Sequence, residues 1–357
     1  MASPSKHHIA VIAGDGIGTE VVQATLPVLE LTAGLHGIEL EWTQLPWGCD
    51  YYQAQGQMMP DNALEVLQLH DAIFLGAIGR PDVPDHISVH GLILPIRQHF
   101  HQFVNLRPMR LLPGVKGPLA GRGPEHLDMV CVRENSEGEY VSVGGRFDVG
   151  SAQERAEQTG VFTRAGISRV VRYAFELAAS RPRRRLASAT KSNALQHSMV
   201  LWDEVAAEIA QEFPQVEYRA YHIDALAARM VTHPESLDVI VASNLFGDIL
   251  TDLGAALTGS LGLAPGANLD PTHQWPSMFE PIHGSAPDIA GQGIANPIGT
   301  IWAGALMLDH LGASAAATEL VAAIEAELRD GSTRTPDLGG SATTTEMAAA
   351  IAARLSR

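Results

Sequence analysis

Short apolar runs, each followed by a stretch with helical apolar spacing, recur along this chain and constrain its fold more than any other feature. His8–Ala13 is an apolar run that ends at a glycine, and Thr19–Leu31 follows with its apolar residues on one helical face. Strands that alternate with helices in this way predict an α/β fold. Further strand patterns occupy Ile38–Leu45, Ala72–Gly76, Leu127–Val132, Leu186–Ala189, Val216–His222 and Leu237–Ala242.

The remainder of the chain carries helical patterns and one long irregular segment. The 357 residues exceed one ordinary core and predict two domains. Gly259–Pro297 is rich in glycine, proline and asparagine, and we expect a binding loop there. Helices are predicted at Asp61–Leu69, Gly91–Phe103, Ser198–Phe213, Ile301–Leu311 and Ser314–Asp330, and another contains Asp248 and Asp252. Two more are predicted from their N-terminal caps: one begins after Thr163 and ends near Ser180, and the last begins after Thr343 or Thr344, with Glu346 in its first turn.

Charge and composition exclude several classes of protein. The net charge of −16 disfavours nucleic acid and anionic membrane surfaces as partners. Cys49 and Cys131 are too few for a disulfide framework and indicate a reducing cytoplasm. Met1–His8 lacks the apolar core of a signal peptide, and no segment approaches the roughly 20 apolar residues that span a bilayer. We therefore expect a cytoplasmic protein with no nucleic-acid or membrane partner.

A glycine-rich loop, Gly14–Gly18, lies where dinucleotide-binding folds place their glycines. The fingerprint G-x-G-x-x-G is not matched, because Thr19 occupies the position of the third glycine. The acidic residue expected about 20 residues further on is also not clearly placed. We interpret the loop as a tight strand-to-helix turn that needs positive φ, and we do not place the cofactor there.

Three arginines and one tyrosine are candidates for substrate binding. Arg97, Arg107 and Arg133 lie in three different predicted segments, and Arg133 ends an apolar strand. Proteins of the α/β class place their ligands at strand ends, and the guanidinium group of arginine pairs a carboxylate through two donors. The three guanidinium groups would therefore hold a dicarboxylate if they converge. Tyr140 follows in a polar loop, where a phenol can protonate a carbanion or enolate. Taken singly, each arginine is more often an ordinary surface residue, and the tyrosine an ordinary half-buried one, so the prediction depends on the whole pattern.

Two carboxylates with helical spacing indicate a metal site. Asp248 and Asp252 stand four residues apart, on one face of a helix, where like charges are unfavourable unless a cation lies between them. Oxygen ligands of this kind favour Mg²⁺ or Mn²⁺ over zinc. Asp224 is a third candidate, in an otherwise apolar stretch. The competing interpretation, a solvated helix face, is opposed by the apolar residues around the pair.

Lys191 is a candidate base. It directly follows the predicted strand Leu186–Ala189, and a lysine beside a divalent cation and arginines has a lowered pKa. A solvated surface lysine is the alternative. Four histidines, at positions 86, 90, 99 and 101, match no compact ligand spacing, so we interpret them as structural or surface residues.

These residues and two longer motifs resemble a known family: the metal-dependent, decarboxylating 2-hydroxyacid dehydrogenases, which include isopropylmalate, isocitrate and tartrate/D-malate dehydrogenases. The best motifs are Asn244–Asp252 and Phe279–Pro297, and the resemblance runs from Gly14 to Gly340. It implies an isopropylmalate dehydrogenase-like fold, not a Rossmann fold, with the active-site cleft between two α/β domains. Residues 1–102 and 259–357 would form the first domain, and residues 103–258 the second.

The resemblance also assigns roles. Arg97, Arg107 and Arg133 would bind the substrate carboxylates, and Ile93 and Leu94 would face its variable group. Lys191 would take part in removing the hydroxyl proton, and Tyr140 would protonate the enolate. Lys191 and Asp224 would reach in from a second subunit, so the active unit would be a homodimer with shared active sites. The Mg²⁺ or Mn²⁺ ligands would be Asp224, Asp248 and Asp252.

The same resemblance places NAD on the loop that contains His283–Ile289. Asp288 would accept the ribose 2′-OH of NAD and repel the 2′-phosphate of NADP. Family members that use NADP carry Lys-Tyr where this chain has Asp288-Ile289. The residues that would bind NAD are Glu280, His283, Gly284, Ser285, Ala286, Asp288, Asn296 and Asn193.

The substrate is expected to be D-malate or tartrate. Val83–Ser88 and Arg133–Tyr140 resemble the tartrate/D-malate branch of the family. Val89-His90 departs from that branch, and Leu94–Arg97 is closer to isopropylmalate enzymes, so 3-isopropylmalate stays open as the alternative. Isocitrate is disfavoured because the Ser and Asn that hold its third carboxylate are absent. The choice of Mn²⁺ or Mg²⁺, a K⁺ requirement and assembly beyond a dimer stay open.

Two other classes compete with this interpretation. An NAD-binding regulatory subunit of the same fold would have a broken catalytic set, whereas Lys191, Tyr140 and the three aspartates are intact here. A metal-dependent hydrolase would leave the segment Gly284–Pro297 without a role. Formation of NADH that depends on Mn²⁺ would separate a dehydrogenase from both.

Overall fold

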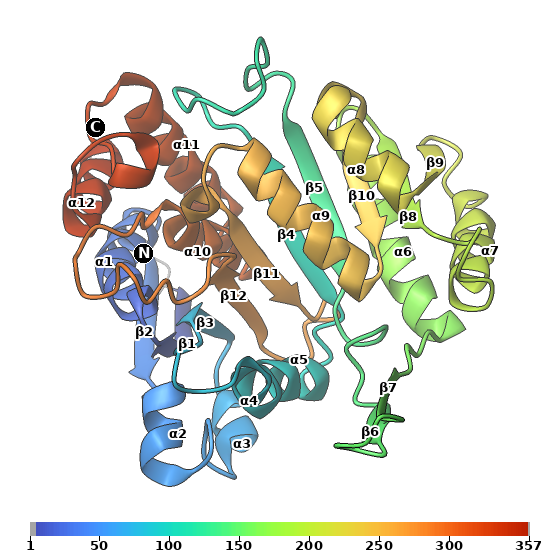
Figure 1. Cartoon of the computed structure of the whole chain (residues 1–357). Helices are drawn as coiled ribbons and strands as arrows, with labels where there is room; N and C mark the ends of the chain where they lie inside the picture. The colour runs from blue at the N-terminus through green and yellow to red at the C-terminus, as the bar shows by residue number, and fades with distance from the viewer. Residues whose placement is uncertain (1–4, 356–357) are drawn as a thin grey trace.

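One sheet of ten strands runs through the part of the chain that the computed structural model describes, residues 5–355 (Figure 1). Its order is β2-β1-β3-β12-β11-β4-β5-β10-β8-β9. One half consists of β2 (Ile38–Gln44), β1 (Ser5–Gly14), β3 (Ala72–Ala77), β12 (Ser277–Pro281) and β11 (Pro265–Leu269). The other half consists of β4 (Val104–Arg110), β5 (Asp128–Glu134), β10 (Val239–Ala242), β8 (Arg185–Thr190) and β9 (Glu217–His222).

Two parallel regions of the sheet are joined by antiparallel strands at its centre. Strands β2, β1, β3 and β12 are parallel to one another, as are β5, β10, β8 and β9. Strand β11 is antiparallel to both β12 and β4, and β4 is antiparallel to β5. The first half takes its strands from residues 1–102 and 259–357 and the second from residues 103–258. The division into two domains at these bounds stays a prediction, and residues 1–4 and 356–357 lie outside the described part.

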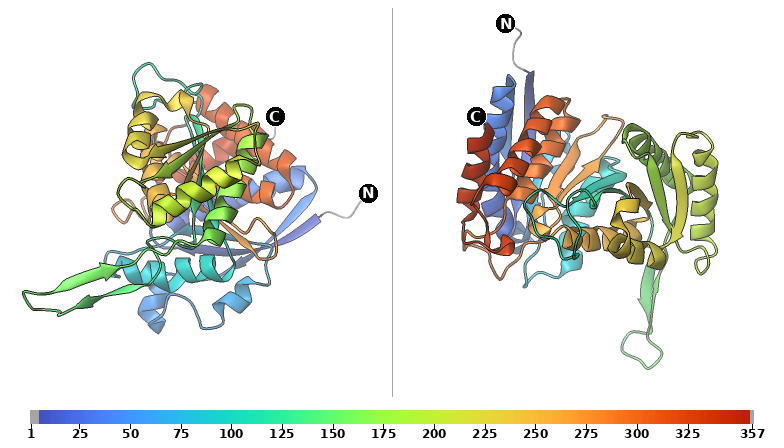
Figure 2. Two further views of the ribbon diagram at one scale, coloured as in Figure 1. Left: turned by 90° about the vertical axis from the view of Figure 1, so that its right-hand side faces the viewer. Right: turned by 90° about the horizontal axis from the view of Figure 1, so that it is seen from above.

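The inner strands β3, β11 and β12 of the first half are buried along their whole length because helices cover both of their faces, whereas the edge strand β2 is partly exposed. Side chains alternate along β1, so that Ile9 and Val11 join one hydrophobic cluster while Ala10 and Ile12 join another. On the first face pack α1 (Ile17–Leu35), α10 (Ile298–His310), α11 (Ser314–Asp330) and α12 (Thr344–Leu355) (Figure 2). The second cluster includes residues of α2 (Cys49–Gln55), α3 (Ala63–Leu67), a π-helix (Val89–Ile93) and α5 (Leu94–His99), and α4 (Asp85–Ser88) precedes the π-helix.

The second half is also covered on both faces. Helices α6 (Arg164–Ser180) and α7 (Ser198–Ala210) pack against each other on one side, and α8 (Ile223–Thr232) and α9 (Asn244–Leu257) on the other. The predicted cap of α6 is confirmed, because Thr163 Oγ1 accepts a hydrogen bond of 2.9 Å from the Gly166 amide. The predicted inner face of α7 is also confirmed, since Trp202, Val205 and Ile209 are buried.

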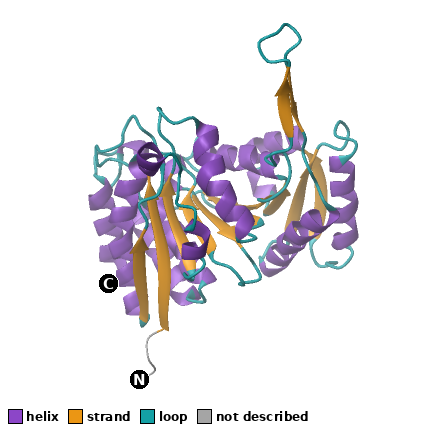
Figure 3. Cartoon of the chain, turned by 90° about the horizontal axis from the view of Figure 1, so that it is seen from below, coloured by secondary structure: helices purple, strands orange, loops and turns teal. Residues whose placement is uncertain are grey.

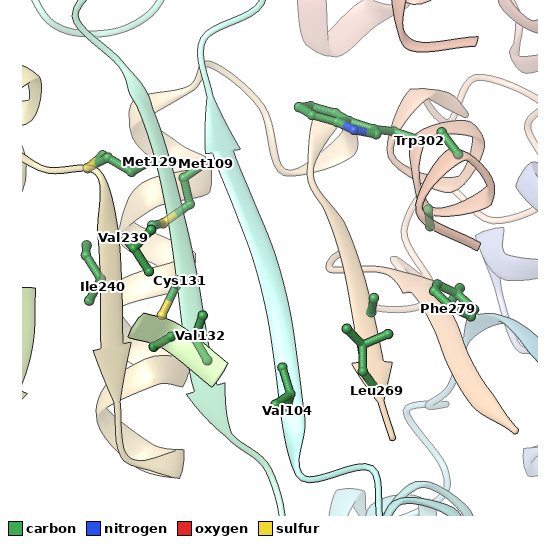
Figure 4. Packing of buried hydrophobic residues seen from close by; sticks show 14 of the residues in the cluster. Val104, Met109, Met129, Cys131, Val132, Val239, Ile240, Leu269, Phe279 and Trp302 are labelled. Atoms are coloured by element: carbon green, nitrogen blue, oxygen red, sulfur yellow. The ribbon is translucent and has the colours of Figure 1, made fainter. Parts of the chain in front are cut away.

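The main hydrophobic cluster continues through the centre of the sheet from one half into the other. Figure 4 shows Cys131 and Val132 of β5 beside Val239 and Ile240 of β10, with Phe279 of β12 further along the sheet. All five side chains are fully buried. The core therefore supports the strands that carry the candidate site.

A two-stranded arm stands apart from the main sheet. Strands β6 (Gly144–Phe147) and β7 (Arg155–Gln158) are paired antiparallel, and every residue in them is exposed. Figure 3 shows the arm projecting away from the rest of the chain. None of the helices in residues 5–355 is long and apolar enough to cross a membrane.

Several local predictions are wrong. Gly259–Pro297 is not wholly irregular, since it contains β11 and β12. The predicted helix Gly91–Phe103 is divided into a π-helix and α5, which ends at His99. Strand β4 was not predicted because Pro108 disrupts the strand pattern. Its missing N–H is tolerated because β11 pairs only with residues 104–106, which leaves that edge of β4 open beyond residue 106. Helices α2 and α8 and the arm were also not predicted.

Candidate active site

Three buried arginines face one another where the two halves of the sheet meet. Arg97 lies in α5, Arg107 in β4 and Arg133 at the end of β5. Their exposed fractions are 8%, 7% and 3%. In addition to burial, the charges of Arg107 and Arg97 both lower the pKa of Arg133, and the charge of Arg97 lowers the pKa of Arg107, as expected for cations that lie close together. Buried cations of one sign are costly unless anions or ligands compensate them. The structure therefore gathers the three predicted substrate residues at one place.

Arg133 is held by residues of α9. Its Nε and Nη2 donate hydrogen bonds of 3.0 and 2.7 Å to Asn244 Oδ1, and its Nη1 pairs with Asp248 Oδ1. Burial, followed by the charge of Arg107, lowers the pKa of Arg133 to about 10. Gly247 is required beside it, because a Cβ there would lie 2.5 Å from Arg133 Cγ. The close approach of α9 to β5 thus fixes the guanidinium.

Arg107 and Arg97 are held in different ways. Arg107 donates from Nε to Asn105 Oδ1 and from Nη1 to Thr251 Oγ1, both at 2.8 Å. Burial lowers the pKa of Arg107. Arg97 Nη2 donates to Glu280 Oε1 at 2.8 Å, while its Nε is buried and unpartnered. A buried donor without an acceptor is unfavourable, and a substrate carboxylate would satisfy it.

Asp248 and Asp252 lie on one face of α9, as predicted from their spacing. Burial would raise the pKa of Asp248, but Arg133 and then Arg107 outweigh it, and the net shift is downward. Burial and the charge of Asp248 raise the pKa of Asp252. Two neighbouring carboxylates with opposed shifts, both offering oxygen ligands, fit a divalent cation such as Mg²⁺ or Mn²⁺.

Asp224 does not join this pair within one chain. Its side chain is 69% exposed and is paired with Lys191 Nζ through Oδ1 at 2.6 Å. This hydrogen bond is the main reason that the pKa of Asp224 is lowered. No three His, Cys, Asp or Glu side chains within residues 5–355 are arranged to hold a metal ion. The three carboxylates predicted to bind the metal are therefore not brought together within the described residues.

Tyr140 lies against the arginines. Its hydroxyl donates to Asp248 Oδ2 at 2.9 Å, and the Arg133 guanidinium lies 5.5 Å from the centre of its ring. Burial, followed by the charge of Asp248, raises the pKa of Tyr140. The phenol therefore keeps its proton at neutral pH and is available to donate it.

A groove of about 750 Å³ opens beside Tyr140. Leu94, Val89 and His90 line it on one side, and the segment from Glu139 to Gly145 lines it on the other. Leu94 and Tyr140 therefore line the same groove, and the prediction that Leu94 faces the substrate stays open. Ile93 instead packs against the second hydrophobic cluster.

The predicted cofactor loop follows β12 and is supported by the glycine-rich turn. The Ile17 amide donates to Ser285 O at 2.9 Å, and a Cβ on Gly16 would lie 2.1 Å from that oxygen. Gly14 and Gly16 have φ of 72° and 54°, so the interpretation of this segment as a turn that needs positive φ is confirmed. The turn thus holds the predicted NAD loop in place.

Within the loop, some polar groups are hydrogen-bonded to the rest of the chain and others are exposed or without a partner. His283 Nε2 is buried without a partner, and burial lowers the pKa of His283, so the ring is neutral. Gly284 and Asp288 are exposed, and Ser285 and Asn296 are buried. Asn296 donates to Asp337 Oδ2 at 2.9 Å. An unpartnered ring nitrogen and an exposed carboxylate fit a dinucleotide that offers hydroxyl groups. Asn193 is exposed just after β8, beyond Lys191.

A known enzyme family matches almost the whole chain. The model of the isocitrate/isopropylmalate dehydrogenase family matches residues 8–351. The chain belongs to this family. The predicted family, its fold and the enzyme class are therefore confirmed.

Individual relatives agree with this assignment. A probable tartrate dehydrogenase/decarboxylase from Agrobacterium vitis is 53% identical over 333 residues, which cover 93% of both chains. A decarboxylating D-malate dehydrogenase from Escherichia coli is 54% identical over 336 residues, which cover 92% of this chain and 93% of the relative. The crystal structure of isocitrate dehydrogenase from Methylococcus capsulatus superposes with a TM-score of 0.89 at 36% identity and covers 98% of this chain and 100% of its own.

Sequence reasoning missed the side chains that hold the arginines in this dehydrogenase. Asn105 would have been found if β4 had been predicted, because period-2 alternation puts it on the same face as Arg107. Asn244 lies within a quoted motif but received no role. Thr251 stands three residues after Asp248 on α9, so helical spacing already placed it near that carboxylate.

Proposed function

We propose that this enzyme oxidises a small 2-hydroxy dicarboxylate, D-malate or tartrate, with NAD and Mn²⁺ or Mg²⁺, and decarboxylates the β-keto acid that forms. The observation that carries the proposal is the convergence of Arg97, Arg107 and Arg133, all buried, beside the Asp248–Asp252 pair. Three guanidinium groups match two carboxylates of one small molecule. The names of the tartrate and D-malate enzymes among its relatives support the same substrate class.

The chain's own residues then have separate tasks. The arginines bind and orient the carboxylates, and the Arg97 Nε that lacks a partner gains one. Asp248 and Asp252, with Asp224 of a partner subunit, would hold the divalent ion. That ion, when bound, supplies charge that acidifies the substrate hydroxyl. Lys191 of the partner accepts the hydroxyl proton, and Tyr140 donates a proton to the carbon that loses CO₂.

The cofactor would lie along the loop after β12. Glu280, His283, Gly284, Ser285, Ala286, Asp288 and Asn296 line its path, and Asn193 of the partner subunit would approach it. NAD, when bound, accepts the hydride from the substrate. The exposed Asp288 carboxylate favours NAD over NADP because a 2′-phosphate there would be repelled.

The lining of the groove favours a second candidate, 3-isopropylmalate. Val89 and Leu94 are apolar and would tolerate an isopropyl group beside Tyr140. His86 and His90 line the same groove, and they suit polar substituents instead. We therefore keep D-malate and tartrate as the first choice.

A substrate panel tests the proposal. D-malate, L-tartrate, meso-tartrate, 3-isopropylmalate and isocitrate are each given with NAD and Mn²⁺, and NADH formation is followed. We expect D-malate or a tartrate to give the highest kcat/KM, and NADP to replace NAD poorly. A dominant 3-isopropylmalate rate would overturn the substrate choice, and no NADH formation with any of them would overturn the enzyme's proposed reaction.

A further inference from the structure

Asn268, in the central strand β11, uses every hydrogen-bonding position of its side chain. The residue is fully buried. Its Oδ1 accepts hydrogen bonds from Asn105 Nδ2 at 2.7 Å and from Asn135 Nδ2 at 2.9 Å. Its Nδ2 donates to Glu280 Oε1 at 2.8 Å and to Met278 O at 3.4 Å. An amide can make four such bonds, so the side chain is saturated.

Two of these four partners, Glu280 and Asn105, each accept a hydrogen bond from a substrate arginine. Glu280 Oε1, which accepts from Asn268, also accepts from Arg97 Nη2 at 2.8 Å. Asn105, which donates to Asn268, accepts from Arg107 Nε through its Oδ1 at 2.8 Å. The guanidinium groups of Arg97 and Arg107 are thus each linked to the Asn268 amide through one intervening side chain.

The strand register brings the network together from both halves of the sheet. Asn268 of β11 is opposite Asn105 of β4, and Asn105 is opposite Arg133 of β5. Directly opposed residues in antiparallel strands share one face of the sheet. The neighbouring residues Ala267 and Phe279 belong to the hydrophobic cluster instead. Asn268 therefore lies at the junction between the halves, on the polar face that carries the arginines.

Packing alone does not require an amide at this buried position. A buried polar group is stable only when its hydrogen bonds are satisfied, and an apolar residue of similar size avoids that requirement. A fully satisfied network, in contrast, fixes the orientation of every group in it. The network uses only Oε1 of Glu280, so the other carboxylate oxygen is not committed to it.

We propose that Asn268 is a positioning residue that fixes Arg97 and Arg107 relative to each other, so that both bind the same dicarboxylate. This role rests on the proposed function, in which the two arginines hold the substrate. Arg97 lies in α5, which packs on the first half of the sheet, and Arg107 lies in β4 of the second half. Asn268 hydrogen-bonds to the partners of both arginines, Glu280 and Asn105, and so links their orientations.

Asn268→Asp tests the role because it removes the hydrogen bonds that Asn268 donates, to Glu280 and to Met278 O, and keeps an oxygen for those that it accepts. The new side chain keeps an oxygen that can accept from Asn105 and Asn135. It replaces the donor to Glu280 with a second carboxylate oxygen, which repels Glu280 and disturbs Arg97. We expect the KM for D-malate to rise about tenfold or more, with a smaller change in kcat, because misplaced binding groups cost affinity. NAD affinity, measured by fluorescence titration, should change by less than about threefold.

Asp270→Asn is the matched control. Asp270 is buried just after β11 and accepts hydrogen bonds from Thr272, Gln274 and Trp275, so the exchange is also nearly isosteric and also removes buried hydrogen bonds. It contacts neither arginine arm. We expect it to lower the Tm and to leave the KM for D-malate within about twofold of the wild type.

A double-mutant cycle with Arg97→Lys distinguishes positioning from a general loss of stability. If Asn268 acts through Arg97, Asn268→Asp should change KM much less in the Arg97→Lys background than in the wild type. Equal effects in both backgrounds would overturn the proposal. Should Asn268→Asp not fold, Asn268→Ser takes its place, and an unchanged KM in folded Asn268→Ser would also overturn it.

Measurements on the wild-type protein distinguish a failure of the proposed function from a failure of the role proposed for Asn268. Binding of D-malate in the presence of Mn²⁺ is measured by calorimetry beside the kinetics. A wild type that neither binds nor oxidises any dicarboxylate would overturn the proposed function, and this role of Asn268 with it. An active wild type with Asn268→Asp and Asp270→Asn alike in KM would overturn the role of Asn268 alone.

Discussion

The arginine cluster and the Lys191–Asp224 pair differ in how completely one chain builds them. Arg97, Arg107 and Arg133 are buried and held by neutral and acidic partners from three different elements, β12, β4 and α9. Lys191 and Asp224 are paired with each other, and Asp224 is largely exposed. The first region is preorganised, whereas the second is an exposed ion pair of the kind that contributes little to stability.

This difference indicates which groups of the proposed site would need a second subunit. A preorganised set of donors can bind carboxylates without help from another subunit. In the proposed function, the Asp248–Asp252 pair would need a third ligand to complete a metal site, and Lys191, which lies outside the arginine cluster, would need to reach the substrate of another copy. We therefore expect the two regions to meet between subunits, and the predictions that follow test this contrast.

The largest effect is expected at Lys191. Lys191→Ala should lower kcat about 10³-fold, because it removes the group that accepts the hydroxyl proton. NAD affinity, measured by fluorescence titration, should stay unchanged. Lys191→Arg keeps the charge and the ion pair with Asp224 but should also be slow, since arginine does not release its proton. Near-normal turnover by either variant would reduce Lys191 to a surface lysine.

The next largest effect is expected at Arg133, in the preorganised arginine cluster. Arg133→Lys should raise the KM for D-malate about 100-fold, because lysine cannot contact Asn244 and the substrate through one rigid fork. Steady-state kinetics measure the change, and the melting temperature serves as the control for folding. An unaltered KM would show that Arg133 is held by α9 for structural reasons only.

Asp252 provides a smaller, metal-specific effect. Asp252→Asn should weaken the apparent Mn²⁺ affinity about 10- to 100-fold while NAD binding is retained. In the wild type, the raised pKa of Asp252 means that it takes up a proton before Asp248 as the pH falls, and metal affinity should fall with it. Mn²⁺ titrations at several pH values measure both trends. Equal losses of metal and NAD binding would contradict the ligand role.

A residue outside both regions should change stability alone. His310 stacks on His273 at 4.2 Å, and burial lowers its pKa from 6.5 to about 4. The unfolded chain therefore protonates at His310 more readily than the folded protein does. The free energy of unfolding is undiminished by this group above pH 6.5 and decreases as the pH falls toward 4. His310→Gln should flatten the fall of the melting temperature over that range without changing kcat. Parallel curves for both proteins would contradict this account.

Much of the fold was predictable because its central strands are buried on both faces and several of its helices have a clear apolar face. The strand at His8–Ala13, the Thr163 cap and the Asp248–Asp252 face were all predicted from local patterns. Strand β4 was not, because Pro108 hides it, and its place in the sheet depends on pairing with β11 rather than on its own residues.

The arginines of the site were predicted, but the network behind them was not. Asn105 and Asn268 are 163 residues apart in the chain, and Arg97 and Glu280 are 183 apart. No local pattern links such pairs, since they meet only through the order of strands in the sheet. Likewise, nothing in the residues next to Asp224 points to the site of another copy, so that assignment comes from the family resemblance alone.

The central claim is that one active site takes its arginines from one chain and Lys191 with Asp224 from another. Hybrid dimers of Arg133→Met and Lys191→Ala subunits, purified through two different tags, test it directly. Each variant alone should be inactive, and the hybrid should regain about half of the wild-type activity, because one of its two sites contains no substitution. A hybrid as inactive as its parents would contradict a site shared between subunits.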